Sequence, residues 1–195
     1  MGVDSFYGRI GKRAFDLAAA ILALAVLSPL MLLIAALIRL TSRGPALFVQ
    51  ERLGRNAVTF RVYKYRTMTD RPRAYDTLYF TGDPNDVTLI GRLLRRTKLD
   101  ELPQLLNVLM GDMSIVGPRP QLAVQLREFD ENGMLRLLVR PGITGMAQTH
   151  GNVALSWPER WRYDADYVRR VSLKLDLGLI ARTVCVVVRG ETPVA

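Results

Sequence analysis

The feature that most constrains this chain is an apolar run near its N-terminus. From Leu17 to Ile38, every residue except Ser28 and Pro29 is apolar. The run is long enough to cross a bilayer as a helix, which takes about 20 residues. A cleavable signal peptide fits poorly, because the apolar stretch continues through residues 30–38 and no small-residue cleavage site precedes a polar start.

Basic residues lie on both flanks of this run: Arg9, Lys12 and Arg13 before it, and Arg39, Arg43, Arg52 and Arg55 after it. Basic flanks prefer the cytoplasmic side of a membrane. Both flanks therefore favour the same side, which a re-entrant helix satisfies and a simple span does not. A kinked helix that spans the membrane is the alternative.

The Ser28-Pro29 pair lies in the middle of the run, where a re-entrant segment would turn. Proline lacks a backbone donor and clashes with the carbonyl four residues earlier, so we expect a helix–break–helix arrangement. The Ser28 hydroxyl is a local candidate to bond a carbonyl freed by the break. At the start of the segment, we expect Lys12, Arg13 and Asp16 to pair and to anchor it at the lipid headgroups.

The rest of the chain is strongly charged. Lysine and arginine total 27 against 18 aspartates and glutamates, giving a net charge of +9. Such a balance indicates an anionic partner, and nucleic acid is disfavoured because no nucleic-acid-binding motif is present. The lone Cys185 excludes an internal disulfide and a cysteine-cluster metal site. The length fits one integrated unit.

Residue patterns predict an α+β, mainly helical fold. Residues 46–50 and 58–65 are rich in Val, Phe and Tyr and indicate a β-hairpin around Gly54-Arg55-Asn56. Four helical regions are expected, at residues 89–96, 101–110, 121–139 and 157–188. The second ends at Gly111. The fourth is in two pieces, and its last part, residues 173–188, is apolar enough to pack on the core or lie along a membrane surface. Residues 69–86 form a polar loop.

Asp100 and Glu101 are the candidate chemical centre. Read locally, Asp100 is an N-cap and Pro103 falls in the first helical turn. However, the pair follows four cationic residues, Arg92, Arg95, Arg96 and Lys98. Further along the chain, Arg119 stands between two prolines, which restrict the direction from which its side chain can reach a phosphate. Two carboxylates among several arginines are what a divalent-metal phosphoryl-transfer site requires, with one carboxylate as nucleophile and the other holding Mg²⁺.

Seven motifs stand in order along the chain: Lys12-Arg13-x-Phe15-Asp16, Ser28-Pro29, Gly44-Pro45-x-x-Phe48-x-Gln50-x-Arg52-x-Gly54, Phe60-x-x-x-Lys64-Tyr65-Arg66-Thr67-Met68, Leu99-Asp100-Glu101-Leu102-Pro103-Gln104, Gly111-Asp112-Met113-Ser114-x-Val116-Gly117-Pro118-Arg119-Pro120 and Arg140-Pro141-Gly142-Ile143-Thr144-Gly145. Together they resemble the bacterial sugar transferases known as monotopic phosphoglycosyl transferases. The resemblance covers residues 9–190, nearly the whole chain.

The resemblance implies a re-entrant membrane hairpin over residues 1–40 and a small catalytic domain over residues 41–195, with amphipathic helices at the membrane interface. Such an enzyme transfers a sugar-1-phosphate from a UDP-sugar to polyprenyl (undecaprenyl) phosphate and releases UMP, the first membrane step of exopolysaccharide assembly. It works at the cytoplasmic face of the bacterial inner membrane. The sequence is compatible with a homo-oligomer.

The same resemblance assigns roles to individual residues. Asp100 would attack the donor phosphate and form a covalent aspartyl-phosphosugar, and Glu101 would bind Mg²⁺. The resemblance implies four phosphate-binding residues. Arg95 and Arg119 match family positions that contact phosphate, and Lys64 and Arg66 match a basic motif of the family.

The sequence departs from the family after Thr144-Gly145, where an arginine often found there is missing and His150 stands nearby. A loop histidine without a catalytic role is the simpler interpretation, and a general-base role is the alternative. Two other functions compete with the transferase: a non-catalytic membrane scaffold that binds anionic lipid, and a metal-dependent phosphohydrolase. The loops 69–86 and 146–156 are expected to select the sugar.

Overall fold

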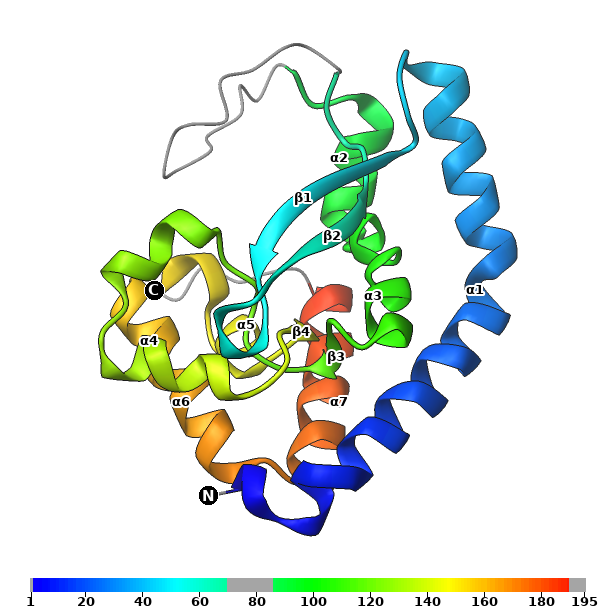
Figure 1. Ribbon diagram of the computed structural model, residues 1–195. Helices are drawn as coiled ribbons and strands as arrows, with labels where there is room; N and C mark the ends of the chain where they lie inside the picture. Colours follow the sequence, from blue (N-terminus) through cyan, green and yellow to red (C-terminus); the bar gives the residue numbers. More distant parts are fainter. Residues whose placement is uncertain (1, 70–85, 190–195) are drawn as a thin grey trace.

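The computed structural model describes residues 2–69 and 86–189. The molecule is mainly helical, with one long N-terminal helix bowed along a body of shorter helices and a central hairpin (Figure 1). The predicted α+β, mainly helical class is confirmed. The principal elements are α1 (Lys12–Thr41), β1 (Leu47–Leu53), β2 (Thr59–Tyr65), α2 (Leu89–Thr97), η5 (Leu99–Glu101), α3 (Gln104–Met110), β3 (Ser114–Val116), η6 (Ala123–Glu128), α4 (Glu131–Leu135), η7 (Arg136–Leu138), β4 (Gly142–Thr144), α5 (Met146–Thr149), α6 (Trp157–Arg170) and α7 (Leu173–Arg189).

Helix α1 is continuous through Ser28-Pro29, so the predicted helix–break–helix is wrong. The Ser28 hydroxyl donates a hydrogen bond of 3.3 Å to the carbonyl oxygen of Ala25. Ala25 is four residues before Pro29, and its carbonyl is the one that the proline leaves without its usual backbone donor. The serine therefore satisfies this carbonyl, as expected, and the helix bends without being interrupted (Figure 1).

Both halves of α1 pack on the same body. In the first half, Ala20 belongs to a core cluster with Val62 of β2 and Val108 of α3. In the second half, Ile34 and Ile38 pack with residues of β2 and α2. The opposite face is apolar and exposed, with Leu22, Val26, Leu32 and Leu40 between 67% and 83% accessible. Within the described chain, the stretch Tyr7–Thr41 is the one helical segment long and apolar enough to cross a membrane.

Lys12 and Asp16 pair as predicted, but they face the protein interior. The Lys12 ammonium lies 3.2 Å from the Asp16 carboxylate, 3.0 Å from that of Asp176 in α7 and 2.6 Å from the Ser114 hydroxyl. Asp16 and Asp176 are fully buried. The predicted anchoring to headgroups is therefore wrong for this pair, which fastens the start of α1 to the body. We call Lys12, Asp16, Ser114 and Asp176 the base cluster.

Arg13 is likewise directed at the protein. Its guanidinium donates to the carbonyl oxygens of Val108 and Leu109, at 2.6 and 2.9 Å. These carbonyls belong to the last turn of α3, whose C-terminal groups lack intrahelical donors. Gly111 ends that helix with a φ of 95°, as predicted.

The hairpin of β1 and β2 is confirmed, with β1 extending further than predicted. The strands pair antiparallel, with Phe48 opposite Lys64 and Arg52 opposite Phe60. Asn107 of α3 fixes the hairpin from the side: its amide donates to the carbonyl of Arg61 at 2.7 Å and accepts from the N–H of Tyr63 at 3.1 Å. This contact fixes β2, which carries Lys64, against α3, and the turn η5 that carries Glu101 directly precedes α3.

Strands β3 and β4 form a short parallel pair at the foot of the Pro118-Arg119-Pro120 turn. Gly117 and Gly142 meet there backbone to backbone, so a side chain on Gly142 would collide with the amide of Gly117. The final helices α6 and α7 confirm the predicted helical tail in two pieces. The predicted sugar-selecting loop at residues 69–86 falls almost entirely outside the described residues.

Candidate active site

Asp100 and Glu101 lie in the short 3₁₀ turn η5, between α2 and α3. Lys98 ends α2 in the left-handed conformation, with a φ of 58°, and redirects the chain into this turn. Helix α3 starts only at Gln104, with Pro103 in the preceding position. The local interpretation of Asp100 as an N-cap is therefore wrong, and its carboxylate is not engaged by the helix.

Glu101 is buried between two cations. Its Oε1 atom accepts from Lys64 Nζ at 2.8 Å and from Arg119 Nη2 at 2.7 Å. Burial alone would raise the pKa of Glu101, but the charges of Arg119 and Lys64 outweigh burial and hold it well below its usual range. The Oε2 atom has no hydrogen-bond partner among the residues that the structure describes. Glu101 is therefore a permanent anion with one oxygen available.

Asp100 is partly buried and makes no side-chain hydrogen bond or ion pair with any residue in 2–69 or 86–189. Burial and the adjacent charge of Glu101 raise its pKa, while Lys64, Arg119 and Lys98 act in the opposite direction. The carboxylate is thus more basic than that of an ordinary aspartate, and it stands beside cations suited to phosphate.

Arg52 of β1 is a site residue that the sequence reasoning did not single out. Its guanidinium donates twice to Oε1 of Gln50, at 3.1 Å from Nε and 2.6 Å from Nη2. Burial, together with the nearby charge of Arg119, lowers the pKa of Arg52 to about 10. Gln50 and Arg52 are two residues apart on a strand, so their side chains lie on the same face. The spacing of the Gln50-x-Arg52 motif in the sequence could therefore have indicated this contact.

The other two predicted phosphate ligands lie apart from the carboxylates. Arg95 donates from Nε to the Thr67 hydroxyl at 2.9 Å. Arg66 is buried and donates to the carbonyl and hydroxyl oxygens of Ser42, at 3.0 and 2.8 Å. The structure therefore brings Lys64 and Arg119 to Glu101 and does not bring Arg66 or Arg95 into contact with it. A phosphate-binding role for these two arginines stays a prediction.

Comparison with known proteins identifies the family of this chain. The family model described as bacterial sugar transferase matches residues 7–190. The chain belongs to the bacterial sugar transferase family. The expectation of a transferase is confirmed at that level.

Individual relatives of this sugar transferase carry more specific names. The exopolysaccharide production protein ExoY of Sinorhizobium fredii is 40% identical over 193 residues, covering 91% of this chain and 85% of the relative. The UDP-N-acetylgalactosamine-undecaprenyl-phosphate N-acetylgalactosaminephosphotransferase of Aeromonas hydrophila is 39% identical over 185 residues, covering 92% and 44%. The UDP-glucose:undecaprenyl-phosphate glucose-1-phosphate transferase of Escherichia coli is 40% identical over 186 residues, covering 90% and 40%. The chain spans less than half the length of these last two enzymes.

His150 of the sugar transferase holds α5 against α7. Its Nδ1 lies 2.7 Å from the carbonyl oxygen of Met146 and its Nε2 lies 2.8 Å from Arg182 Nη1. Because arginine only donates, Nε2 accepts and Nδ1 carries the proton. The ring also stacks on Tyr163, with centroids 4.9 Å apart. The lone pair of Nε2 is engaged by Arg182, so the geometry fits a histidine without a catalytic role.

The carboxylates present fit the predicted Mg²⁺. The described residues contain no cluster of three or more His, Cys, Asp or Glu side chains that would form a metal cage. Magnesium needs none, because it is commonly bound through one or two carboxylates together with substrate phosphates and water. The free Oε2 of Glu101, next to Asp100, offers such a carboxylate.

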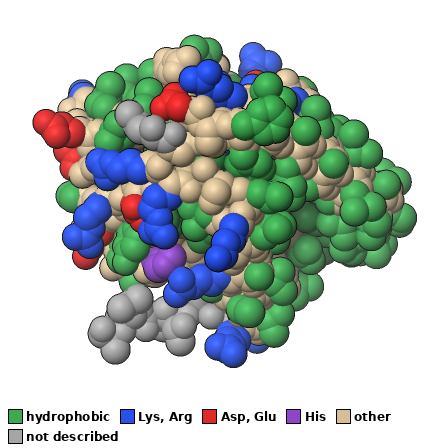
Figure 2. All heavy atoms as spheres, turned by 90° about the horizontal axis from the view of Figure 1, so that it is seen from below, with side chains coloured by type: hydrophobic (Ala, Val, Ile, Leu, Met, Phe, Trp, Pro, Cys, Tyr) green, Lys and Arg blue, Asp and Glu red, His purple; other side chains and the backbone are tan. Residues whose placement is uncertain are grey.

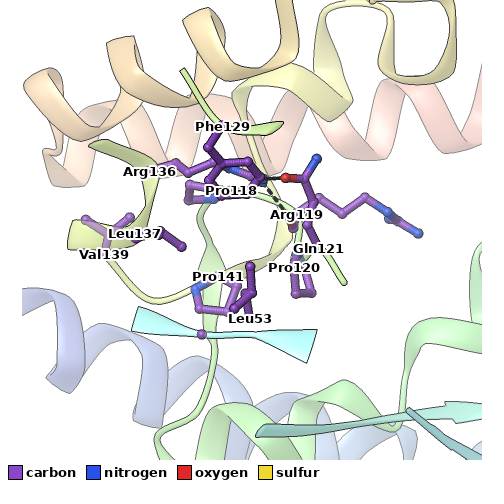
Figure 3. A pocket seen from close by; sticks show the side chains of 11 residues that line it. Leu53, Pro118, Arg119, Pro120, Gln121, Phe129, Arg136, Leu137, Val139 and Pro141 are labelled. Atoms are coloured by element: carbon purple, nitrogen blue, oxygen red, sulfur yellow. Dashed lines mark hydrogen bonds between the residues drawn. The ribbon is translucent and has the colours of Figure 1, made fainter. Parts of the chain in front are cut away.

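A cavity lies behind the Pro118-Arg119-Pro120 turn, lined by the turn itself, β1 and the segment around Arg136 (Figure 3). Its volume of about 10 Å³ holds about one water. The side chain of Arg119 points out of this cavity (Figure 3). The cavity is therefore too small for a nucleotide sugar, and the candidate active site lies on the side to which Arg119 points, where it meets Glu101.

Proposed function

We propose that this chain transfers a sugar-1-phosphate from a UDP-sugar to a polyprenyl phosphate, releasing UMP, through a covalent intermediate on Asp100. The names of the Aeromonas hydrophila and Escherichia coli relatives support the donor and acceptor classes. One observation carries the mechanism: Asp100 makes no side-chain hydrogen bond or ion pair with the described residues and lies beside Glu101, which is held by Lys64 and Arg119.

In the first step, an Asp100 carboxylate oxygen attacks the sugar-proximal phosphorus of the donor. The bond from that phosphorus to the bridging diphosphate oxygen breaks, and UMP leaves with the electron pair. In the second step, a phosphate oxygen of the acceptor attacks the same phosphorus and restores the Asp100 carboxylate. The raised pKa of Asp100 suits the first step, because a more basic carboxylate is a better nucleophile.

Cations at the site offset the repulsion between an anionic nucleophile and an anionic diphosphate. The Arg119 side chain is 44% exposed, so its guanidinium can face a phosphate while its Nη2 remains on Glu101. Lys64 is more buried and fixes Glu101 from the hairpin side. Mg²⁺, held by Glu101, would neutralise charge on the diphosphate when bound.

We further propose that α1 is re-entrant and places the site at the cytoplasmic face of the inner membrane. Both flanks of α1 are basic, and both halves of the helix pack on one body while the outer face stays apolar. A straight span would carry one end away from the body across about 30 Å of hydrocarbon. Single cysteines introduced at Ser5 and Thr69, in the Cys185→Ala chain, should both react with a reagent confined to the cytoplasmic side. Labelling from opposite sides would contradict the proposal.

The transfer reaction is tested by UMP release from UDP-sugars in the presence of polyprenyl phosphate and Mg²⁺. We expect turnover that requires the acceptor and is abolished by Asp100→Asn. Asp166→Asn is the matched control, because Asp166 is a surface carboxylate paired only with Arg170 in the described chain, and it should keep full activity. Turnover without acceptor would favour a phosphohydrolase, and absence of turnover across a panel of UDP-sugars would favour the lipid-binding scaffold.

A further inference from the structure

A buried ion pair lies on the far side of the Pro118-Arg119-Pro120 turn from the candidate active site. Arg136 of η7 and Asp164 of α6 are 5% and 2% exposed, and their Nη2 and Oδ2 atoms lie 3.0 Å apart. Phe129 covers the guanidinium, with its ring centroid 5.6 Å away. Neither Arg136 nor Asp164 has a part in the proposed chemistry, and a buried pair that only held α6 would need no contact with the turn.

Arg136 also donates to the turn. Its Nη1 donates to the side-chain oxygen of Gln121, and its Nη2 donates to the main-chain carbonyl of Arg119 (Figure 3). The guanidinium is a planar fork with donors fixed relative to one another. Once Asp164 and Gln121 set its orientation, the fork therefore sets the position of the Arg119 carbonyl as well.

The turn depends on its carbonyl groups for support, because Pro118 and Pro120 have no N–H to donate. The Pro118 carbonyl accepts from the N–H of Gly142 at 2.9 Å, and the Gln121 carbonyl accepts from the N–H of Leu53 at 2.7 Å. These bonds fix the two ends of the turn. At its centre, the Arg119 carbonyl is held by a buried charged side chain.

We propose that Arg136, oriented by Asp164, is a positioning residue that holds the backbone of Arg119 so that the Arg119 guanidinium meets Glu101 and the donor diphosphate. The inference rests on the proposed function for the identity of the donor. Its effect passes through Arg119 alone, since Arg136 lies behind the turn and the Arg119 side chain points away from it (Figure 3).

The test measures donor kcat and KM for UMP release by the full chain, with UDP binding measured in parallel because binding needs no turnover. Asp164→Asn removes the charge that orients the fork. Arg136→Lys keeps the positive charge, but a single ammonium nitrogen cannot occupy the positions of both Nη1 and Nη2. Because a misplacement of about 1 Å can cost a hundredfold in rate, we expect each variant to lower kcat/KM for the donor about tenfold, with weaker UDP binding. The KM for polyprenyl phosphate should not change.

Two comparisons separate positioning from loss of stability. Phe129→Leu disturbs the same core, where Phe129 also packs on Trp161, but leaves the Arg136 fork its acceptors; it should lower the melting temperature and leave the donor kcat/KM unchanged. In an Arg119→Ala background, Asp164→Asn and Arg136→Lys should change UDP affinity by less than about twofold, because sites that act only through one another are not additive.

The inference is overturned if the two variants weaken UDP binding in the Arg119→Ala background as much as they do in the parent, or if both variants bind UDP and turn over donor like the parent. Should Asp164→Asn fail to fold, Arg136→Lys decides between the same outcomes. Failure of the proposed function can be told apart from failure of this inference. In the first case the unmodified chain would release no UMP, and the UDP-binding comparison would still report whether Arg136 acts through Arg119.

Discussion

The base cluster and the candidate active site each contain two carboxylates, and they differ in how Asp176 and Asp100 are hydrogen-bonded. Asp176 in the base cluster is fully buried and accepts from Tyr7 at 2.6 Å, Tyr167 at 2.8 Å and Lys12 at 3.0 Å. In the site, Glu101 is held by two cations while the neighbouring Asp100 has no partner among the described residues. Both oxygens of Asp176 are engaged and help to fasten α1 to the body, whereas the carboxylate of Asp100 has no such bonds in the described chain and can react.

The largest expected effect is on stability and comes from the base cluster. Asp176→Asn weakens three buried hydrogen bonds to a charged acceptor, from Tyr7, Tyr167 and Lys12. At about 1.5–3 kcal/mol for a bond to a charged group, the free energy of unfolding should fall by about 3 kcal/mol or more. Protein that stays folded should release UMP at a rate close to the parent's, because the site is untouched. Thermal unfolding and UMP release, measured on the same detergent-solubilised sample, check both halves. Tyr7→Phe is the milder control, with a loss of about 1.5 kcal/mol for one hydrogen bond to a charged group.

Arg119→Ala should show the reverse pattern. Removing a donor to a developing charge typically costs about a hundredfold in rate, or roughly 2.7 kcal/mol of transition-state stabilisation. The Arg119 side chain is 44% exposed, and Lys64 remains to pair with the buried Glu101. The melting temperature should therefore fall less than in Asp176→Asn. If Arg119→Ala instead caused a large loss of stability with normal turnover, the proposed difference between a stabilising base cluster and a reactive site would be contradicted.

The pH dependence of UMP release should report Asp100. Only the ionised carboxylate attacks, so the rate should be full above its pKa and fall about tenfold per pH unit below it. Because burial and Glu101 raise this pKa, the decline should begin at a higher pH than for an ordinary aspartate. The Lys64 charge lowers the same pKa, so Lys64→Met should move the decline to still higher pH. A decline that does not move would contradict the proximity of Lys64 to Asp100.

The smallest effect is expected at His150. Its accepting nitrogen is engaged by Arg182 and its proton by Met146, so it has no free group for proton transfer. His150→Gln should change the rate of UMP release by less than about threefold, in contrast to the hundredfold or more expected of a general base. A loss of that larger size would place a third functional group outside the carboxylate pair.

The sequence predicted those parts of the fold that depend on local pattern. Runs rich in Val, Phe and Tyr on either side of Gly54-Arg55-Asn56 predicted the hairpin of β1 and β2, and Gly111 predicted the end of α3. Such turns and helix caps are encoded within a few residues. The predicted break at Pro29 was wrong for a local reason as well. The Ser28 hydroxyl bonds the Ala25 carbonyl that Pro29 leaves without a backbone donor, and α1 continues through the proline.

Contacts between distant segments were beyond such patterns. Nothing near Lys12 in the sequence shows that its partner is Asp176, which is contributed by the last helix. Arg66 and Arg95 look equivalent to Lys64 and Arg119 as cations, yet their direction depends on how α1, β2 and α2 pack. The family motifs nevertheless brought Asp100, Glu101, Lys64 and Arg119 to notice, and these four residues are the ones that the fold assembles.

The most direct test of the central claim is the mass of the protein after brief exposure to a UDP-sugar and Mg²⁺ without acceptor. A covalent intermediate on Asp100 predicts an added mass equal to one sugar phosphate, located on the peptide that contains Asp100. The adduct should disappear when polyprenyl phosphate is added, and it should be absent in Asp100→Asn. An adduct on another residue, or full turnover with no adduct under rapid quenching, would contradict the assignment of Asp100 as the nucleophile.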